Sequence, residues 1–211
     1  MTRFFILLAV VAACLSSQSF ASYQSPFAHY SDKPHDLFFS SSTDLAHTFG
    51  TNIRVVNMSS EDEEKIRLAE EKIKLIIASE EFKKSVLNHR YNGLKKFANN
   101  EGLTNSQIYR RILEGAERLN PLSNNVMDMD VQLYYEKSTI VGYTMSGSKS
   151  ININKKYFNK FTIGRLCGNM MHEWLHKLGF KHDVKKTVKR GYSVPYAVGR
   201  IISLLGKKEG F

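Results

Sequence analysis

The sequence predicts a mixed α/β fold in a single domain. Segments with the apolar spacing of amphipathic helices precede and follow a group of short, alternating strand-like segments. The composition, 42% hydrophobic and 24% charged, is that of an ordinary globular protein. It excludes collagen-like and mainly disordered chains. The 211 residues suffice for one good hydrophobic core but not for two full-sized domains.

A strand and two helices are expected first. The β-branched segment 52–57 is typical of a strand. Ser60 and Glu63 have the spacing of a capping box and predict the start of a long helix. A second helix is predicted from Ser79 towards Gly93.

The middle of the chain is predicted to contain one more helix and then the strands. Thr104 and Gln107 form another capping-box pattern, and Pro121 marks the end of this helix. Three short strand-like segments follow at 129–135, 139–144 and 150–154.

Two helices are predicted to complete the domain. Thr162 can cap a helix that reaches Leu178, where Gly179 favours its termination. Ser193 and Pro195 suit the start of a C-terminal helix. We expect Gly206 to end it.

The N-terminus has the pattern of an export signal. In residues 1–21, Arg3 precedes a short apolar run, and small residues favour cleavage before Ser22. The run is shorter than the roughly 20 apolar residues of a membrane-spanning helix. We therefore predict a periplasmic or secreted protein. In the alternative interpretation, Val11-Ala12-Ala13-Cys14 is a lipoprotein box that anchors the protein through Cys14.

Residues 22–50 are rich in Ser, His and aromatic residues without clear periodicity, and we expect an irregular arm. Residues 51–211 then form the predicted catalytic domain. The folded part of the chain keeps Cys167 alone, whichever interpretation of the leader holds. The fold therefore has no internal disulfide, and Cys167 is expected to be a small buried residue.

Positive charge is concentrated at the C-terminal end. The formal net charge is +10, and residues 151–211 supply all of it, with 13 basic and 3 acidic residues. Such a field favours acidic peptide segments or an anionic envelope surface as partners. Nucleic acid is not an expected partner, because export and the absence of a basic-aromatic groove pattern argue against it.

One stretch carries the chemistry. His172 and His176 are four residues apart on the predicted helix, so they lie about 40° apart on one face and can reach the same metal ion. Gly179 lets the chain turn back so that His182 becomes a third ligand. Three imidazoles leave one position of a tetrahedral zinc ion open, which is the catalytic arrangement. Glu173 lies beside this position and is predicted to be the general base.

The spacing His172-Glu173-x-x-His176-x-x-Gly179-x-x-His182 resembles the zinc-binding signature of the metzincin metalloendopeptidases. The resemblance implies a zincin-like α+β fold, one catalytic zinc ion held by the three histidines, and Glu173 as the general base. Asp183 after the last ligand is similar to the reprolysin version, in which the acid supports the site. The strands of 139–154 resemble the region whose edge strand pairs with an extended substrate.

One feature departs from this family. Metzincins have a methionine turn beneath the metal, but no methionine follows Met171 here. The segment Ser193-Val194-Pro195-Tyr196 looks like the corresponding turn with Pro195 in place of methionine. The resemblance then implies Tyr196 as a second catalytic residue that stabilises the transition state, with Tyr192 as the competing candidate.

These observations predict an exported zinc metalloendopeptidase that hydrolyses peptide bonds through an activated water molecule. Its expected substrates are peptides or proteins, with a preference for acidic segments. The alternative is a non-catalytic, zinc-stabilised protein that binds a peptide along its edge strand. The natural substrate, the latency mechanism and the oligomeric state stay open.

Overall fold

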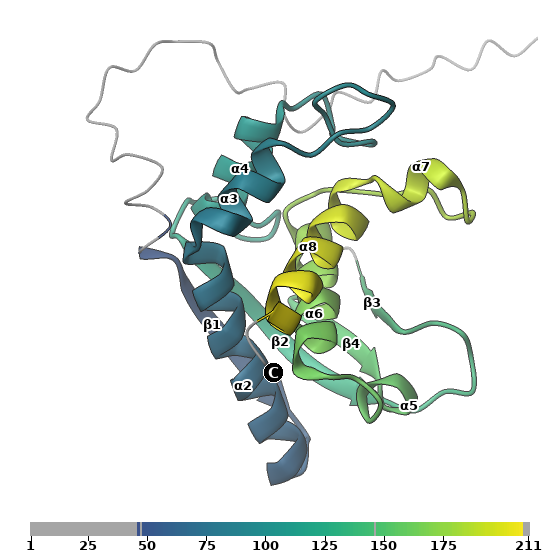
Figure 1. Cartoon of the computed structure of the whole chain (residues 1–211). Helices are drawn as coiled ribbons and strands as arrows, with labels where there is room; N and C mark the ends of the chain where they lie inside the picture. Colours follow the sequence, from purple (N-terminus) through teal and green to yellow (C-terminus); the bar gives the residue numbers. More distant parts are fainter. Residues whose placement is uncertain (1–45, 47, 146, 209–211) are drawn as a thin grey trace, which may run out of the picture. The chain divides into compact units, whose positions relative to one another are not determined.

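A computed structural model describes residues 46, 48–145 and 147–208, all within a unit that spans Ser40–Phe211. These residues form a mixed α/β fold, as predicted, with helices packed on a four-stranded sheet (Figure 1). The expected signal peptide, Cys14 and nearly all of the arm lie outside the described residues. No helix in the described part of the chain is both long and apolar enough to span a membrane.

The sheet has the strand order β1-β2-β4-β3. Strand β1 (Gly50–Val56) pairs in parallel with β2 (Val126–Tyr134), which pairs in parallel with β4 (Ser150–Asn154). The short strand β3 (Gly142–Thr144) is antiparallel to β4 and forms one edge of the sheet. The prediction of β4 is confirmed in both bounds, whereas β2 begins earlier and β3 later than the sequence pattern indicates.

The two faces of the sheet differ in polarity. Along β2 the buried residues Met127, Met129 and Val131 alternate with partly exposed ones. The opposite face carries polar side chains, among them Arg54 and Asp130, which form an ion pair at 2.6 Å. Helices therefore cover one face of the sheet, and the other face is polar, partly exposed along β2 and buried at Asn152 and Asn154 of β4.

The helices are α2 (Ser60–Ala78), α3 (Glu80–Leu87), α4 (Asn105–Glu114), α5 (Lys155–Phe158), α6 (Ile163–Lys177), α7 (Val188–Gly191) and α8 (Val194–Lys208). The capping box of α4 is confirmed, with both Thr104 and Gln107 making their bonds. The N-cap of α2 is Ser59 rather than Ser60, because the Ser59 hydroxyl accepts from the backbone N–H of Asp62.

Helices α6 and α8 approach closely through small residues (Figure 1). A Cβ atom on Gly168 would lie 2.5 Å from the carbonyl oxygen of Gly199 and 2.8 Å from Cβ of Ser203. A Cβ atom on Gly206 would lie 3.0 Å from Cα of Gly164. The prediction that Gly206 ends the C-terminal helix is therefore wrong: it lies within α8, where it permits this close approach.

Candidate metal centre

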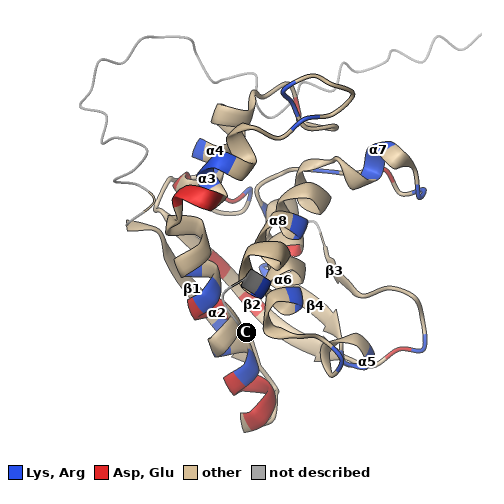
Figure 2. Ribbon diagram, in the orientation of Figure 1, with Lys and Arg blue, Asp and Glu red and all other residues tan. Residues whose placement is uncertain are grey.

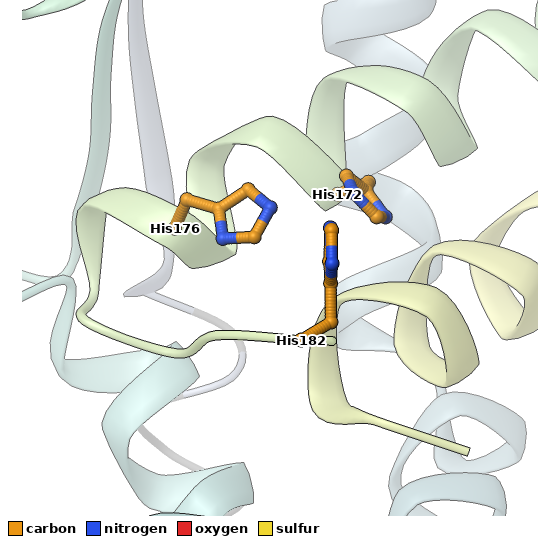
Figure 3. Close-up of side chains that lie close together, drawn as sticks. All are labelled: His172, His176 and His182. Atoms are coloured by element: carbon orange, nitrogen blue, oxygen red, sulfur yellow. The ribbon is translucent and has the colours of Figure 1, made fainter. Parts of the chain in front are cut away.

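The three histidines of the motif converge on one point (Figure 3). His172 and His176 project from α6, and His182 comes from the loop that follows it. One ring nitrogen from each histidine lies within 4.8 Å of the others. Nitrogens around a single ion at about 2.0–2.1 Å from the metal are separated by roughly 3–4 Å, so small side-chain adjustments bring this set to a metal ion.

Local signals in the sequence place the ligands. The Thr162 hydroxyl accepts from the backbone N–H of Arg165 and begins α6. The helix terminates at Gly179, whose φ of 97° few other residues adopt. The N–H of Phe180 bonds back to the carbonyl oxygen of Leu175, as in a Schellman motif. This turn directs the following chain beneath α6 and places His182 opposite the helical ligands.

Backbone carbonyls hold two of the ligand rings. Nδ1 of His176 lies 2.8 Å from the carbonyl oxygen of Phe180, and Nδ1 of His182 lies 3.0 Å from that of Asp183. Such bonds fix the proton on one ring nitrogen and leave the other free to bind metal.

The three rings are kept neutral, which is the form that binds metal. Burial and the neighbouring histidines lower the pKa of His172 to about 3. Burial lowers the pKa of His176 to about 4, and it also lowers that of His182. A neutral, pre-oriented three-histidine set fits zinc, because imidazole nitrogen is among its preferred ligands.

Glu173, the residue after the first histidine ligand, is buried. It is 4% exposed, and burial raises its pKa to about 8. A bound divalent cation close by would favour the ionised carboxylate. The pKa of Glu173 therefore depends both on its burial and on whether a cation is bound close by.

The edge strand runs past this carboxylate. A Cβ atom on Gly142, the first residue of β3, would lie 3.4 Å from Oε1 of Glu173 and 2.9 Å from the carbonyl oxygen of Asn152. The same Cβ position lies 3.4 Å from Oδ1 of Asn169, a buried oxygen without a hydrogen-bond partner in the described structure. Glycine at this position lets the strand approach the carboxylate.

Tyr196 lies against the histidine cluster. Its ring centroid is 4.5 Å from that of His172 and 4.7 Å from that of His182, in edge-on geometry. The guanidinium of Arg190 covers the same ring at 4.7 Å. Tyr192 instead contacts the rings of Tyr91 and His89, away from the three histidines.

The other residues singled out in the sequence have different environments. Asp183 anchors the ligand loop, since its carboxylate accepts from Asn99 and Thr187, and the Asn99 bond lowers its pKa. Cys167 is fully buried, as predicted, and burial raises its pKa to about 12.

A pocket of about 430 Å³ adjoins the histidine cluster on the His176 side. Its wall includes the end of β3 at Thr144 and Met145, the loop carrying Lys149, and the turn at residues 117–120. The metal-ligand side of the pocket is formed by the last turn of α6 and the chain after it. The pocket and the edge strand are therefore continuous with the candidate metal centre.

Sequence reasoning missed three contributors to this region. The sequence contains a weak signal for Gly142, because a glycine within a strand marks a place where another part of the protein approaches the strand closely. It contains none for Arg190 and Glu117, since they reach the site only through tertiary packing.

The chain matches no protein-family model, no curated protein and no solved structure. What the structure shows is a cluster of three histidines that can hold a metal ion. The identity of the ion and the reaction are inferred below from the chemistry of the residues.

Proposed function

We propose that this protein is an exported zinc metalloendopeptidase of the metzincin type. The observation that carries the proposal is the buried carboxyl group of Glu173, which follows the first of three convergent histidines along α6 and lies next to a sheet edge. A purely structural zinc site needs four protein ligands and no neighbouring base, whereas three ligands leave a position for water. Export rests on the pattern of residues 1–21 alone.

Each residue has a role in the proposed reaction. Zinc held by His172, His176 and His182 would supply a Lewis acid that acidifies water and polarises the peptide carbonyl. Glu173 takes the proton from the attacking water and gives it to the leaving amine. Tyr196 donates a hydrogen bond to the oxyanion that develops on the carbonyl. Strand β3 offers its free edge to an extended substrate, which positions the scissile bond near Glu173.

The decisive experiment compares the mature chain with Glu173→Gln on a mixed peptide library, with cleavage read by mass spectrometry. We expect the zinc-loaded wild type to cleave peptides and the variant to lose about 10²–10⁴ in rate while retaining zinc. A chelator should abolish the wild-type activity. Equal cleavage by both proteins would exclude Glu173 as the base.

The alternative function, a zinc-stabilised peptide-binding protein, predicts a different result. Folded, zinc-loaded wild type would then bind peptides and yield no products. Metal content alone cannot separate the two functions, because both include a bound ion.

A further inference from the structure

The pocket beside His176 has a surplus of cationic hydrogen-bond donors. Four basic residues line it, namely Arg118, Lys149, Lys177 and Lys181. Among the described residues, none of the four forms an ion pair, and three of them are exposed. Figure 2 shows basic residues on α7, which follows the loop that carries His182.

Lys177 supplies the inner cation. Its side chain is only 8% exposed, and Nζ donates one hydrogen bond, 3.0 Å long, to the carbonyl oxygen of Ser148. An ammonium group can donate three hydrogen bonds, so Nζ of Lys177 can donate further hydrogen bonds beside this loop. Glu117, Asp130 and Asp128 act on this charge without forming an ion pair with it, so an anion that reaches the ammonium group would gain a hydrogen bond.

The two acidic residues in the wall are already engaged. The carboxylate of Asp128 accepts from the side-chain amides of Asn52 and Asn124, one on each oxygen. Oε1 of Glu117 accepts from the indole N–H of Trp174, and its Oε2 is buried without a hydrogen-bond partner. The four basic residues of the wall outnumber these two acidic ones. Because cationic donors outnumber the acidic residues in the wall, we expect the pocket to bind a negatively charged group.

We infer that this pocket binds an acidic side chain of the peptide substrate. The inference rests on the proposed peptidase function and defines its substrate class. A peptide paired with β3 would leave the strand at Thr144 and Met145, directly at the pocket mouth. Because His176 lines the pocket, the acidic residue occupies a position close to the cleaved bond and on one side of it only.

The volume agrees with this occupant. About 430 Å³ lies at the lower end of the range for small-ligand pockets, enough for one side chain and the adjoining backbone. Phe180 and Met145 in the wall provide apolar contact for the methylene groups of a glutamate.

The test uses a peptide that wild type cleaves, and the same peptide with its acidic residue replaced by the amide. We expect kcat/KM for the acidic peptide to exceed that for the amide by about tenfold or more, since a charged hydrogen bond is worth roughly 1.5–3 kcal/mol. The exposed pair Lys149→Gln/Lys181→Gln should lower this ratio, although Lys177 and Arg118 remain in the pocket. Lys185→Gln/Lys186→Gln removes the same charge outside the pocket and should retain the wild-type ratio.

Two outcomes would overturn the inference: a wild-type ratio near one, or an equal loss of the ratio in both double variants. The second result would mean that the general positive field selects the substrate. If no protein cleaves any peptide, the peptidase proposal fails separately. In that case the affinity of fluorescently labelled acidic and amide peptides for zinc-loaded Glu173→Gln, read by anisotropy, still decides whether the pocket selects acid.

Discussion

At the residue scale, the backbone contributes as much to the candidate site as the side chains do. The carbonyl groups of Phe180 and Asp183 hold two of the ligand rings, and no substitution can remove them directly.

Tyr196→Phe tests the role of the phenol. The variant keeps the ring that packs against His172 and His182, so zinc content and the melting temperature should stay at the wild-type level. Loss of one oxyanion donor should reduce kcat by about 10²–10³. Tyr192→Phe is the matched control and should retain activity, because its ring faces Tyr91 and His89. If the control loses as much activity as Tyr196→Phe, the roles must be reassigned.

Glu117 predicts a pH dependence of stability. Burial raises the pKa of this carboxyl group above the ordinary value of 4.5, so the folded protein holds its proton more tightly than the unfolded chain. The free energy of unfolding should therefore fall as the pH rises through the range from 4.5 to the folded pKa.

Glu117→Gln should remove this contribution while keeping an oxygen acceptor for the Trp174 indole. Urea denaturation at a series of pH values measures the effect. Parallel pH profiles for the two proteins would show that Glu117 carries no such linkage.

At the scale of elements, the contact between α6 and α8 sets the position of the site. The small residues that join these helices lie one turn from His172, and a Cβ atom on Gly199 would lie 3.3 Å from Cβ of that ligand. Tyr196 belongs to α8, so the spacing of the two helices determines how its ring meets the histidines.

Gly168→Ala should therefore weaken both stability and the site. The added methyl group would lie 2.5 Å from the Gly199 carbonyl, and overpacking of this kind costs about 1–3 kcal/mol. Thermal denaturation and zinc titration measure the two effects. Gly191→Ala is the control, because a Cβ atom there meets nothing within 4 Å. A Gly168→Ala variant as stable as the control would contradict the close helix contact.

At the scale of the whole molecule, the hydrophobic core exists independently of the metal centre. Phe158, Ile112 and Phe82 are buried far along the chain from the ligands, whereas Trp174 lies on α6 between Glu173 and His176. The core thus extends directly beneath the site. Packing against this core holds α6, the helix that carries the ligands His172 and His176.

Removal of metal should consequently destabilise the domain without unfolding it. At a free zinc concentration about 100 times Kd, bound metal adds about 2.7 kcal/mol to the free energy of unfolding. A chelator should lower the melting temperature and leave the far-ultraviolet circular dichroism at 25 °C unchanged. Complete loss of structure on chelation would show that the metal is required for folding, as in zinc fingers.

The sequence by itself determined the local features. The caps of α4 and α6, the strand β4, the turn at Gly179 and the helical spacing of His172 and His176 all follow from interactions within a few residues. Such interactions leave short, recognisable patterns. A strand at 129–135 was likewise predicted, and β2 begins three residues earlier, at Val126.

Only the tertiary structure decided the rest. The role of Gly206 inside α8, the approach of Gly142 to Glu173 and the cover of Arg190 over Tyr196 each join residues more than five positions apart in the chain. The pocket beside His176 likewise combines the turn at 117–120, the loop at Lys149 and the end of α6. Close packing between distant segments depends on the shapes of both partners, and neither segment alone encodes it.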